Sequence, residues 1–344
     1  MHKNWHQNGR PPAALHPRRK RQKAFYPPSR FEGYFSALAS FAIIVLSGVL
    51  VTQGDEPVPA NLSAQSMPSP EFVRVNPGTF TPRRTPAEAR SDERSPAHKV
   101  KISRPFLVSS TEITNFQMVT ALKYGIEKNY IETTAVSATM PKKRGETEVT
   151  LVNYQNSDIT YKLGQWSISP GKENHPCTGV TWYGAQVYAN LYSLGKNLTP
   201  ATNTANWTCD DTSNGFRLPT ESEWEFACHT GGVNRGEQVA LKSQTDAHHI
   251  NNSNHVNHSP SNAWGLFGMQ GNVSEWCLDW HGATRQSLEI DPRGPDEGWR
   301  RIVRGSSYLN HSQAPGTAFR KPVLPFNDSR TRGFRIVRTL SQFD

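Results

Sequence analysis

Seven short blocks rich in glycine and aromatic residues follow one another in the last two-thirds of the chain, and they constrain the fold more than any other feature. The blocks are residues 76–80 (NPGTF), 104–115 (RPFLVSSTEITN), 179–185 (GVTWYGA), 215–228 (GFRLPTESEWEFAC), 264–280 (WGLFGMQGNVSEWCLDW), 304–308 (RGSSY) and 333–338 (GFRIVR). Their glycines permit tight turns, and their aromatic side chains supply core. With 25 Gly and 25 Pro among 344 residues, the composition is typical of a loop-rich globular protein.

Helix starts are predicted from three threonines. Thr114 and Thr220 are each followed three residues later by Gln or Glu, which is the spacing of a capping box. After Thr181, apolar residues recur at three and four positions, as on one face of a helix. Short strands are expected at residues 72–75 and 100–108. Few helices, short strands and long loops predict an α+β fold with little regular structure.

Three glutamates, Glu221, Glu223 and Glu225, fall in or near the first turn of the third predicted helix. Carboxylates there meet the positive end of the helix dipole. We therefore favour helix capping and a salt bridge to Arg217 over a pair of catalytic carboxylates.

A basic segment and an apolar run predict a membrane anchor near the N-terminus. Residues 1–34 form a basic tail that we expect to be disordered and cytoplasmic, and residues 35–51 (FSALASFAIIVLSGVLV) are just long enough to span a bilayer. The C-terminal domain is then expected outside the cytoplasm, in a periplasmic or extracellular location. A cleaved signal that leads to secretion and a buried core helix are the alternatives. Residues 54–70 have the composition of a linker.

The net charge does not predict a nucleic-acid partner. Residues 1–32 hold eight Lys or Arg and one Glu, which is +7 of the total of +9. The rest of the chain is therefore near neutral, which argues against a basic nucleic-acid surface.

Taken in this order, the blocks resemble the formylglycine-generating enzyme family, the sulfatase-modifying factors. The resemblance covers residues 71–340 and leaves residues 124–172 as an insertion, in which a hairpin is expected at residues 148–154. It implies an irregular C-type-lectin-like architecture, which agrees with the α+β class predicted from the residues.

The block at residues 304–308 bears on catalysis. In aerobic members of the resembled family, two cysteines that follow this block hold Cu(I), a soft ion that prefers sulfur ligands. The matching positions here are Asn310 and Pro315, so copper is not expected. The cleft that the resemblance implies would be lined by polar side chains, which are Ser307, Tyr308, Asn310, His311 and Arg320.

The resemblance also implies calcium, with backbone carbonyls of Gly271 and Val273 and the carboxylate of Glu275 as ligands. Gly268 departs from the family, which usually has Asp or Asn there. The alternative is a metal-free loop in which Glu275 accepts backbone hydrogen bonds. In the histidine-rich segment 246–258, a polar surface loop is favoured over a transition-metal site.

A second calcium site is implied by the resemblance at the same histidine-rich segment. Its candidate ligands are Asn251 and Asn252.

Four cysteines in a domain expected outside the cytoplasm allow disulfides. We favour a Cys209–Cys228 pair, and buried free thiols are the alternative. The chain has no C-x-x-C motif, so neither a zinc knuckle nor a thioredoxin-like site is predicted.

These observations favour a membrane-anchored binding module that holds a peptide or small ligand in the family cleft without copper chemistry. Its partner would be an unidentified protein, peptide or small molecule. The alternative is an enzyme, either a formylglycine-generating oxidase acting on a sulfatase cysteine or another oxidase of the superfamily. Whether the chain is an enzyme stays open, because the family implies an oxidoreductase while the cysteine pair is missing.

Overall fold

The computed structural model describes residues 67–82, 99–134, 136–141, 148–230, 252–282, 288–309 and 320–341. The chain divides into two compact units, residues 1–53 and 54–344, and every described residue belongs to the second unit. The predicted tail and the apolar run at residues 35–51 therefore lie outside the described residues. Within the described residues, no helix combines the length and the apolar character that crossing a bilayer requires.

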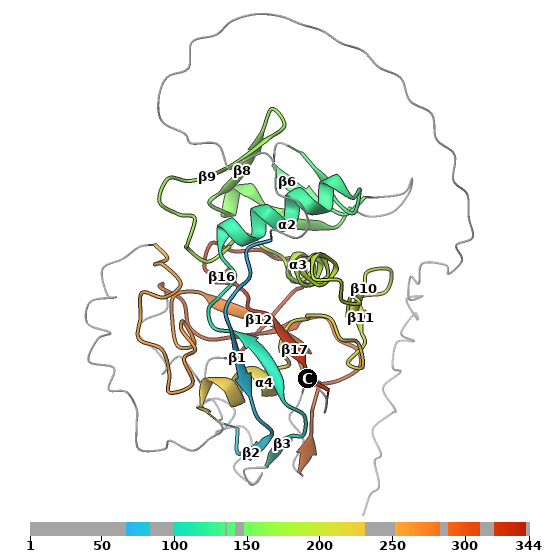
Figure 1. The fold of residues 1–344 in the computed structure, drawn as a ribbon, viewed down its shortest axis with the longest axis vertical. Helices are drawn as coiled ribbons and strands as arrows, with labels where there is room; N and C mark the ends of the chain where they lie inside the picture. The colour runs from blue at the N-terminus through green and yellow to red at the C-terminus, as the bar shows by residue number, and fades with distance from the viewer. Residues whose placement is uncertain are drawn as a thin grey trace, which may run out of the picture. The chain divides into compact units, whose positions relative to one another are not determined.

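Helices are few and strands are short in the described part of the second unit (Figure 1). The helical elements are α2 (Asn115–Glu127), η2 (Tyr154–Asn156, a 3-10 turn), α3 (Trp182–Gly195) and α4 (Glu221–Cys228). The strands are β1 (Phe72–Val75), β2 (Gly78–Phe80), β3 (Val100–Ile102), β4 (Phe106–Ser109), β5 (Glu132–Thr133), β6 (Ser137–Thr139), β7 (Thr150–Asn153), β8 (Ile159–Lys162), β9 (Gln165–Ile168), β10 (Thr202–Asn203), β11 (Thr208–Cys209), β12 (Ser274–Trp280), β13 (Glu289–Ile290), β14 (Arg301–Arg304), β15 (Arg320–Val323), β16 (Arg332–Gly333) and β17 (Val337–Thr339). The predicted α+β class is confirmed.

Each α-helix in the described residues begins at the threonine that the sequence predicted. Thr114 accepts a hydrogen bond from the backbone N–H of Gln117, and Thr220 accepts one from Glu223; both reciprocal bonds are present, so both capping boxes are complete. Thr181 caps α3 with its side chain. Each such cap contributes about 1 kcal/mol to helix stability.

Strand β12 lies at the centre of the fold. In its sheet, of order β15-β14-β12-β16, β14 runs antiparallel to it and β16 parallel. Successive side chains of a strand face opposite sides. Trp276 and Leu278 accordingly pack into one apolar cluster, with α2 and α3, while Cys277 packs into another, with α4. The strand therefore separates two cores.

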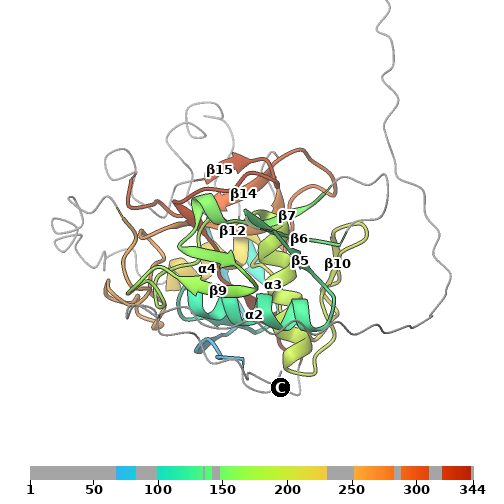
Figure 2. The same ribbon diagram turned by 90° about the horizontal axis from the view of Figure 1, so that it is seen from above.

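The first core includes the inserted segment. Helix α3 lies between α2 and β12 in both views (Figures 1 and 2). The insertion adds a β5-β6-β7 sheet and a separate β8-β9 pair. Residues 148–154 contribute β7, which pairs antiparallel with the preceding strand β6, and a second, tighter hairpin is β8-β9.

The second core brings distant parts of the chain into one sheet. Strand β4 has β1 on one side and β17 on the other, both antiparallel (Figure 1). A further sheet of order β13-β3-β2 and helix α4 complete this core.

We predict that Gly184→Ala lowers the free energy of unfolding by about 1–3 kcal/mol, the usual cost of overpacking. A Cβ at this position of α3 would lie 2.1 Å from the backbone oxygen of Leu151 in β7. Gly271→Ala is the matched control, because a Cβ there meets no atom within 4 Å. Urea denaturation of the two variants gives the comparison, and equal midpoints would contradict the close packing of α3 on β7.

Candidate functional site

A buried ion pair between β12 and the C-terminal segment lies at the centre of the candidate site. Arg335 donates from Nε to Glu275 Oε2 at 2.7 Å and from Nη2 to Oε1 at 2.8 Å. The same guanidinium donates to the backbone oxygens of Ser109 and Phe267, and Trp224 Nε1 donates to Glu275 Oε2 at 2.8 Å. Both charged side chains are fully buried, so this bidentate pair belongs to the strong class of charge-assisted bonds.

The ion pair bears on the predicted calcium site. Both oxygens of Glu275 already accept hydrogen bonds, and a calcium ion bound there would face the guanidinium of Arg335. Within the described ranges, no group of three or more His, Cys, Asp or Glu side chains is arranged to hold a metal ion. Neither observation measures binding, so calcium at Gly271, Val273 and Glu275 stays a prediction.

Glu112, a carboxylate that the sequence reasoning did not single out, lies against the same loop. It is fully buried, and neither of its oxygens has a hydrogen bond of normal geometry to any described residue. A Cβ on Gly268, whose φ is +69°, would lie 2.4 Å from Glu112 Oε1. The glycine that departs from the resembled family therefore leaves the room that the Glu112 carboxylate fills.

The two loops to which the resemblance assigned calcium contact each other. The Asn254 N–H donates to Asn272 Oδ1 at 2.9 Å, and Asn272 Nδ2 donates to the Asn254 backbone oxygen at 3.3 Å. Asn252 uses its Oδ1 locally, to accept from the N–H of Ser253. Asn251 lies outside the described residues, and calcium at this pair stays a prediction.

Helix α4 is joined to β14 and β15 by a network of carboxylates and arginines. Arg320 donates from Nε to Glu221 Oε1 at 2.7 Å and from Nη2 to Glu221 Oε2 at 3.1 Å. Arg304 contacts Glu221 at 3.3 Å and Glu225 at 3.1 Å. Burial, together with the Glu221 carboxylate, raises the pKa of Asp279 to about 7. Two of the three glutamates of α4 thus neutralise arginines on the neighbouring strands.

The structure brings together only part of the predicted cleft. Ser307 is buried, and its Oγ has no hydrogen-bond partner in the part of the chain that is described. The Tyr308 N–H donates to the backbone oxygen of Asn272 at 2.9 Å, which places Tyr308 beside the predicted calcium loop. Asn310 and His311 lie outside the described residues.

The predicted Cys209–Cys228 disulfide is wrong, because all four cysteines are free thiols. Cys228 belongs to the second core and donates its thiol to the backbone oxygen of Met269, whereas Cys209 packs at the edge of the first core. Burial raises the pKa of both thiols, that of Cys228 to about 12. Both therefore stay protonated near neutral pH.

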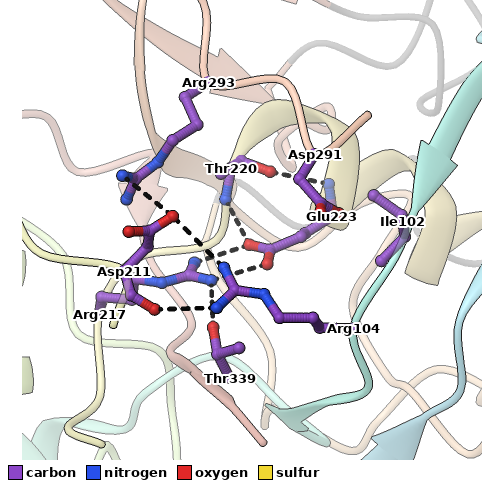
Figure 3. Close-up of a pocket in the computed structure, with 9 residues that line it drawn as sticks. All are labelled: Ile102, Arg104, Asp211, Arg217, Thr220, Glu223, Asp291, Arg293 and Thr339. Carbon is purple, nitrogen blue, oxygen red and sulfur yellow. Dashed lines mark hydrogen bonds and ion pairs between the residues drawn. The ribbon is translucent and has the colours of Figure 1, made fainter. Parts of the chain in front are cut away.

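A small cavity with ionic walls lies beside α4 (Figure 3). It is lined by Ile102, Arg104, Asp211, Arg217, Thr220, Glu223, Asp291, Arg293 and Thr339. The predicted Arg217–Glu223 salt bridge is confirmed here, with both contacts at 2.7 Å. Asp211 lies between the other two arginines, at 3.3 and 3.7 Å. The volume of about 20 Å³ holds about one water molecule, so this cavity is an ion-pair site and not a substrate pocket.

The sequence is similar to a known domain family and to several curated proteins. The sulfatase-modifying factor enzyme 1-like domain matches residues 58–340. The chain is 30% identical over 321 residues to the serine/threonine-protein kinase pkn1 of Chlamydia pneumoniae, a match that covers 90% of this chain and 44% of the kinase. It is 27% identical over 278 residues to the formylglycine-generating enzyme of Streptomyces coelicolor, covering 71% of this chain and 81% of the enzyme. The chain thus spans less than half the length of the chlamydial kinase.

Solved structures show the fold alone, because their sequence identities are low. Treponema denticola variable protein 1 superposes with a TM-score of 0.57 at 21% identity, covering 78% of this chain and 95% of that protein. PvdO from Pseudomonas aeruginosa gives a TM-score of 0.51 at 18% identity, covering 83% of this chain and all of PvdO. The irregular architecture implied by the resemblance is therefore confirmed.

We predict that Glu112→Gln flattens the pH dependence of stability. Burial, with the Glu275 carboxylate adding to it, raises the pKa of Glu112 from the ordinary value of 4.5 to about 8. The folded protein then holds a proton that the unfolded chain releases, so this contribution is present below about pH 4.5 and is lost as the pH rises through about 8. Urea unfolding between pH 5 and 8.5 should show a fall of roughly 1–3 kcal/mol in the parent and a smaller fall in the variant.

The control for this experiment is Glu127→Gln, at an exposed glutamate at the end of α2. It should keep the pH profile of the parent. Identical profiles for the parent and Glu112→Gln would mean that Glu112 is ionised throughout this range.

Proposed function

This chain belongs to the sulfatase-modifying factor enzyme 1-like domain family, and we propose that it is a ligand-binding member that works without copper chemistry. Its ligand would be a peptide or small molecule held in the family cleft. The described cleft residues support a rigid, polar wall. Arg320 is fixed by the Glu221 carboxylate of α4, and Tyr308 is fixed by the neighbouring loop. A site whose side chains are already held in place loses little conformational freedom on binding.

The observation that carries the proposal is that the chain offers no thiolate pair for Cu(I). Cu(I) prefers thiolate ligands, and the family positions for them hold Asn310 and Pro315. The chain has four cysteines, and burial raises the pKa of each of their thiols. Because only a thiolate is a good ligand for the soft ion, the residues present do not fit copper. We derive no step through it.

Formylglycine generation is the second candidate function. It is favoured by the likeness to the Streptomyces coelicolor enzyme, of which this chain covers 81%. This chemistry would convert a cysteine of a partner sulfatase, and it would require soft metal ligands other than the two family positions.

The apolar run at residues 35–51, with basic residues ahead of it, supports a further proposal, that the domain is anchored to a membrane and faces away from the cytoplasm. Alkaline carbonate washing of membranes from expressing cells should leave the full chain in the membrane fraction. A variant without residues 35–51 is the control and should be released. Release of the full chain as well would contradict the anchor.

We predict that the purified domain, supplied with Cu(I) and a Cys-x-Pro-x-Arg peptide, consumes no oxygen above the rate of copper and peptide alone. It should also leave Cu(I) on a competing chromogenic chelator. The matched variant Asn310→Cys/Pro315→Cys restores the two thiols and should withdraw Cu(I) from the chelator. An aldehyde product formed by the parent protein would overturn the proposal and favour the second candidate function.

A further inference from the structure

Arg301, the first residue of β14, has its guanidinium between two tryptophan rings. Its Cζ lies 3.8 Å from the ring centroid of Trp182 and 3.3 Å from that of Trp280. The two indoles are nearly parallel, with centroids 6.5 Å apart and an angle of 17° between their planes. Arg301 is only 6% exposed, so two aromatic faces replace most of the water around this cation.

Among the described residues, the guanidinium of Arg301 finds a hydrogen-bond partner for only one of its nitrogens. Nη1 donates to the backbone oxygen of Leu278 at 2.7 Å. Nε is buried and has no hydrogen-bond partner, and Nη2 makes no hydrogen bond to any described residue. The Nε–Nη2 edge is the one with which Arg335 and Arg320 each grip a carboxylate in this same protein. In Arg301 this edge has no partner among the described residues.

The pKa of Arg301 also differs from the pKa values of the arginines that are paired with carboxylates. Burial acts to lower the pKa of Arg335 and Arg304, but neighbouring carboxylates outweigh it, and both values end above the ordinary one. For Arg301, burial lowers the pKa to about 9, against weaker opposing effects of Tyr183, Asp279 and Cys209. Arg301 therefore stays protonated at neutral pH as a buried cation without an ion-pair partner among the described residues. Such a charge is costly unless an anion joins it.

Two half-buried aromatic residues extend the slot. Tyr183 packs edge-on against Trp182, with ring centroids 5.6 Å apart. Trp207 lies 4.6 Å from Tyr183 and 6.4 Å from Trp182, measured between ring centroids. Aromatic walls around a single charged group are typical of sites for small organic ligands.

We propose that Arg301 anchors a binding site for a small organic carboxylate. The carboxylate would pair with the Nε–Nη2 side of the guanidinium at the edge of the two stacked indoles, and its carbon skeleton would lie against Tyr183 and Trp207. Because the guanidinium itself fills the gap between the rings, a ligand can meet it only in the guanidinium plane, which suits a planar carboxylate better than a tetrahedral phosphate.

This site is separate from the predicted cleft. Arg301 begins β14, whereas the residues from Arg304 to Tyr308 lie at and beyond its other end, about 10 Å away along an extended strand. The proposal therefore does not depend on the proposed function of the cleft.

Isothermal titration calorimetry with sodium benzoate tests the site, and benzamide is the neutral probe of the same shape. Benzoate should bind the unaltered protein saturably, at least tenfold more tightly than benzamide and than inorganic phosphate. Arg301→Lys keeps the positive charge but loses the planar guanidinium and its two parallel N–H donors, so benzoate affinity should fall at least tenfold. Arg338→Lys, on β17 with its Nε bonded to the backbone oxygen of Asn214, is the matched control and should bind benzoate like the parent.

Three outcomes would overturn the proposal. They are equal binding of benzoate and benzamide, binding of phosphate as tight as that of benzoate, and full benzoate affinity in Arg301→Lys. If Arg301→Lys does not fold, as judged by circular dichroism, the comparison of the three probes on the unaltered protein still decides.

Discussion

The contact on which the rest of the structure depends is the buried pair of Glu275 and Arg335. Through it, β12 is joined to the C-terminal segment, to β4 by the Ser109 oxygen and to α4 by Trp224. Both partners are inaccessible to water, so the loss of either would leave an uncompensated buried charge, which costs about 3–5 kcal/mol. The loop of residues 268–273, which carries part of the candidate site, leads directly into β12.

Local features were predictable from the sequence, and partners distant in the chain were not. The caps at Thr114 and Thr220 and the Arg217–Glu223 pair depend on residues three to six positions apart, and all three are present. Arg335 lies in a recognised block, but its carboxylate is 60 positions away, and nothing local indicates which acid it chooses. The disulfide prediction failed for the same reason, because the two thiols pack into cores on opposite sides of β12.

The residues that build the family fold and those that would carry the family's copper chemistry lie in different parts of this chain. The scaffold residues of the blocks are present and make the contacts that the fold requires, whereas the two positions that bind copper lie in a connection between β14 and β15 and hold Asn310 and Pro315. A fold of this kind keeps its architecture while the residues of its loops change, so function must be argued from each site. Arg301 illustrates this, since its slot is formed by residues of α3, β12 and β14.

The central ion pair also has a consequence for biosynthesis. Ser109 and Arg335, which share a hydrogen bond, are 226 positions apart, and the β12 strand between them is buried on both faces. At translation rates of roughly 5–20 residues per second, Arg335 is synthesised roughly 10–45 seconds after Ser109. Contacts between residues so far apart in the sequence make folding slow, and strand edges that can aggregate stay unpaired during that time. The nascent polypeptide is therefore a natural client for chaperones until its last strands have been made.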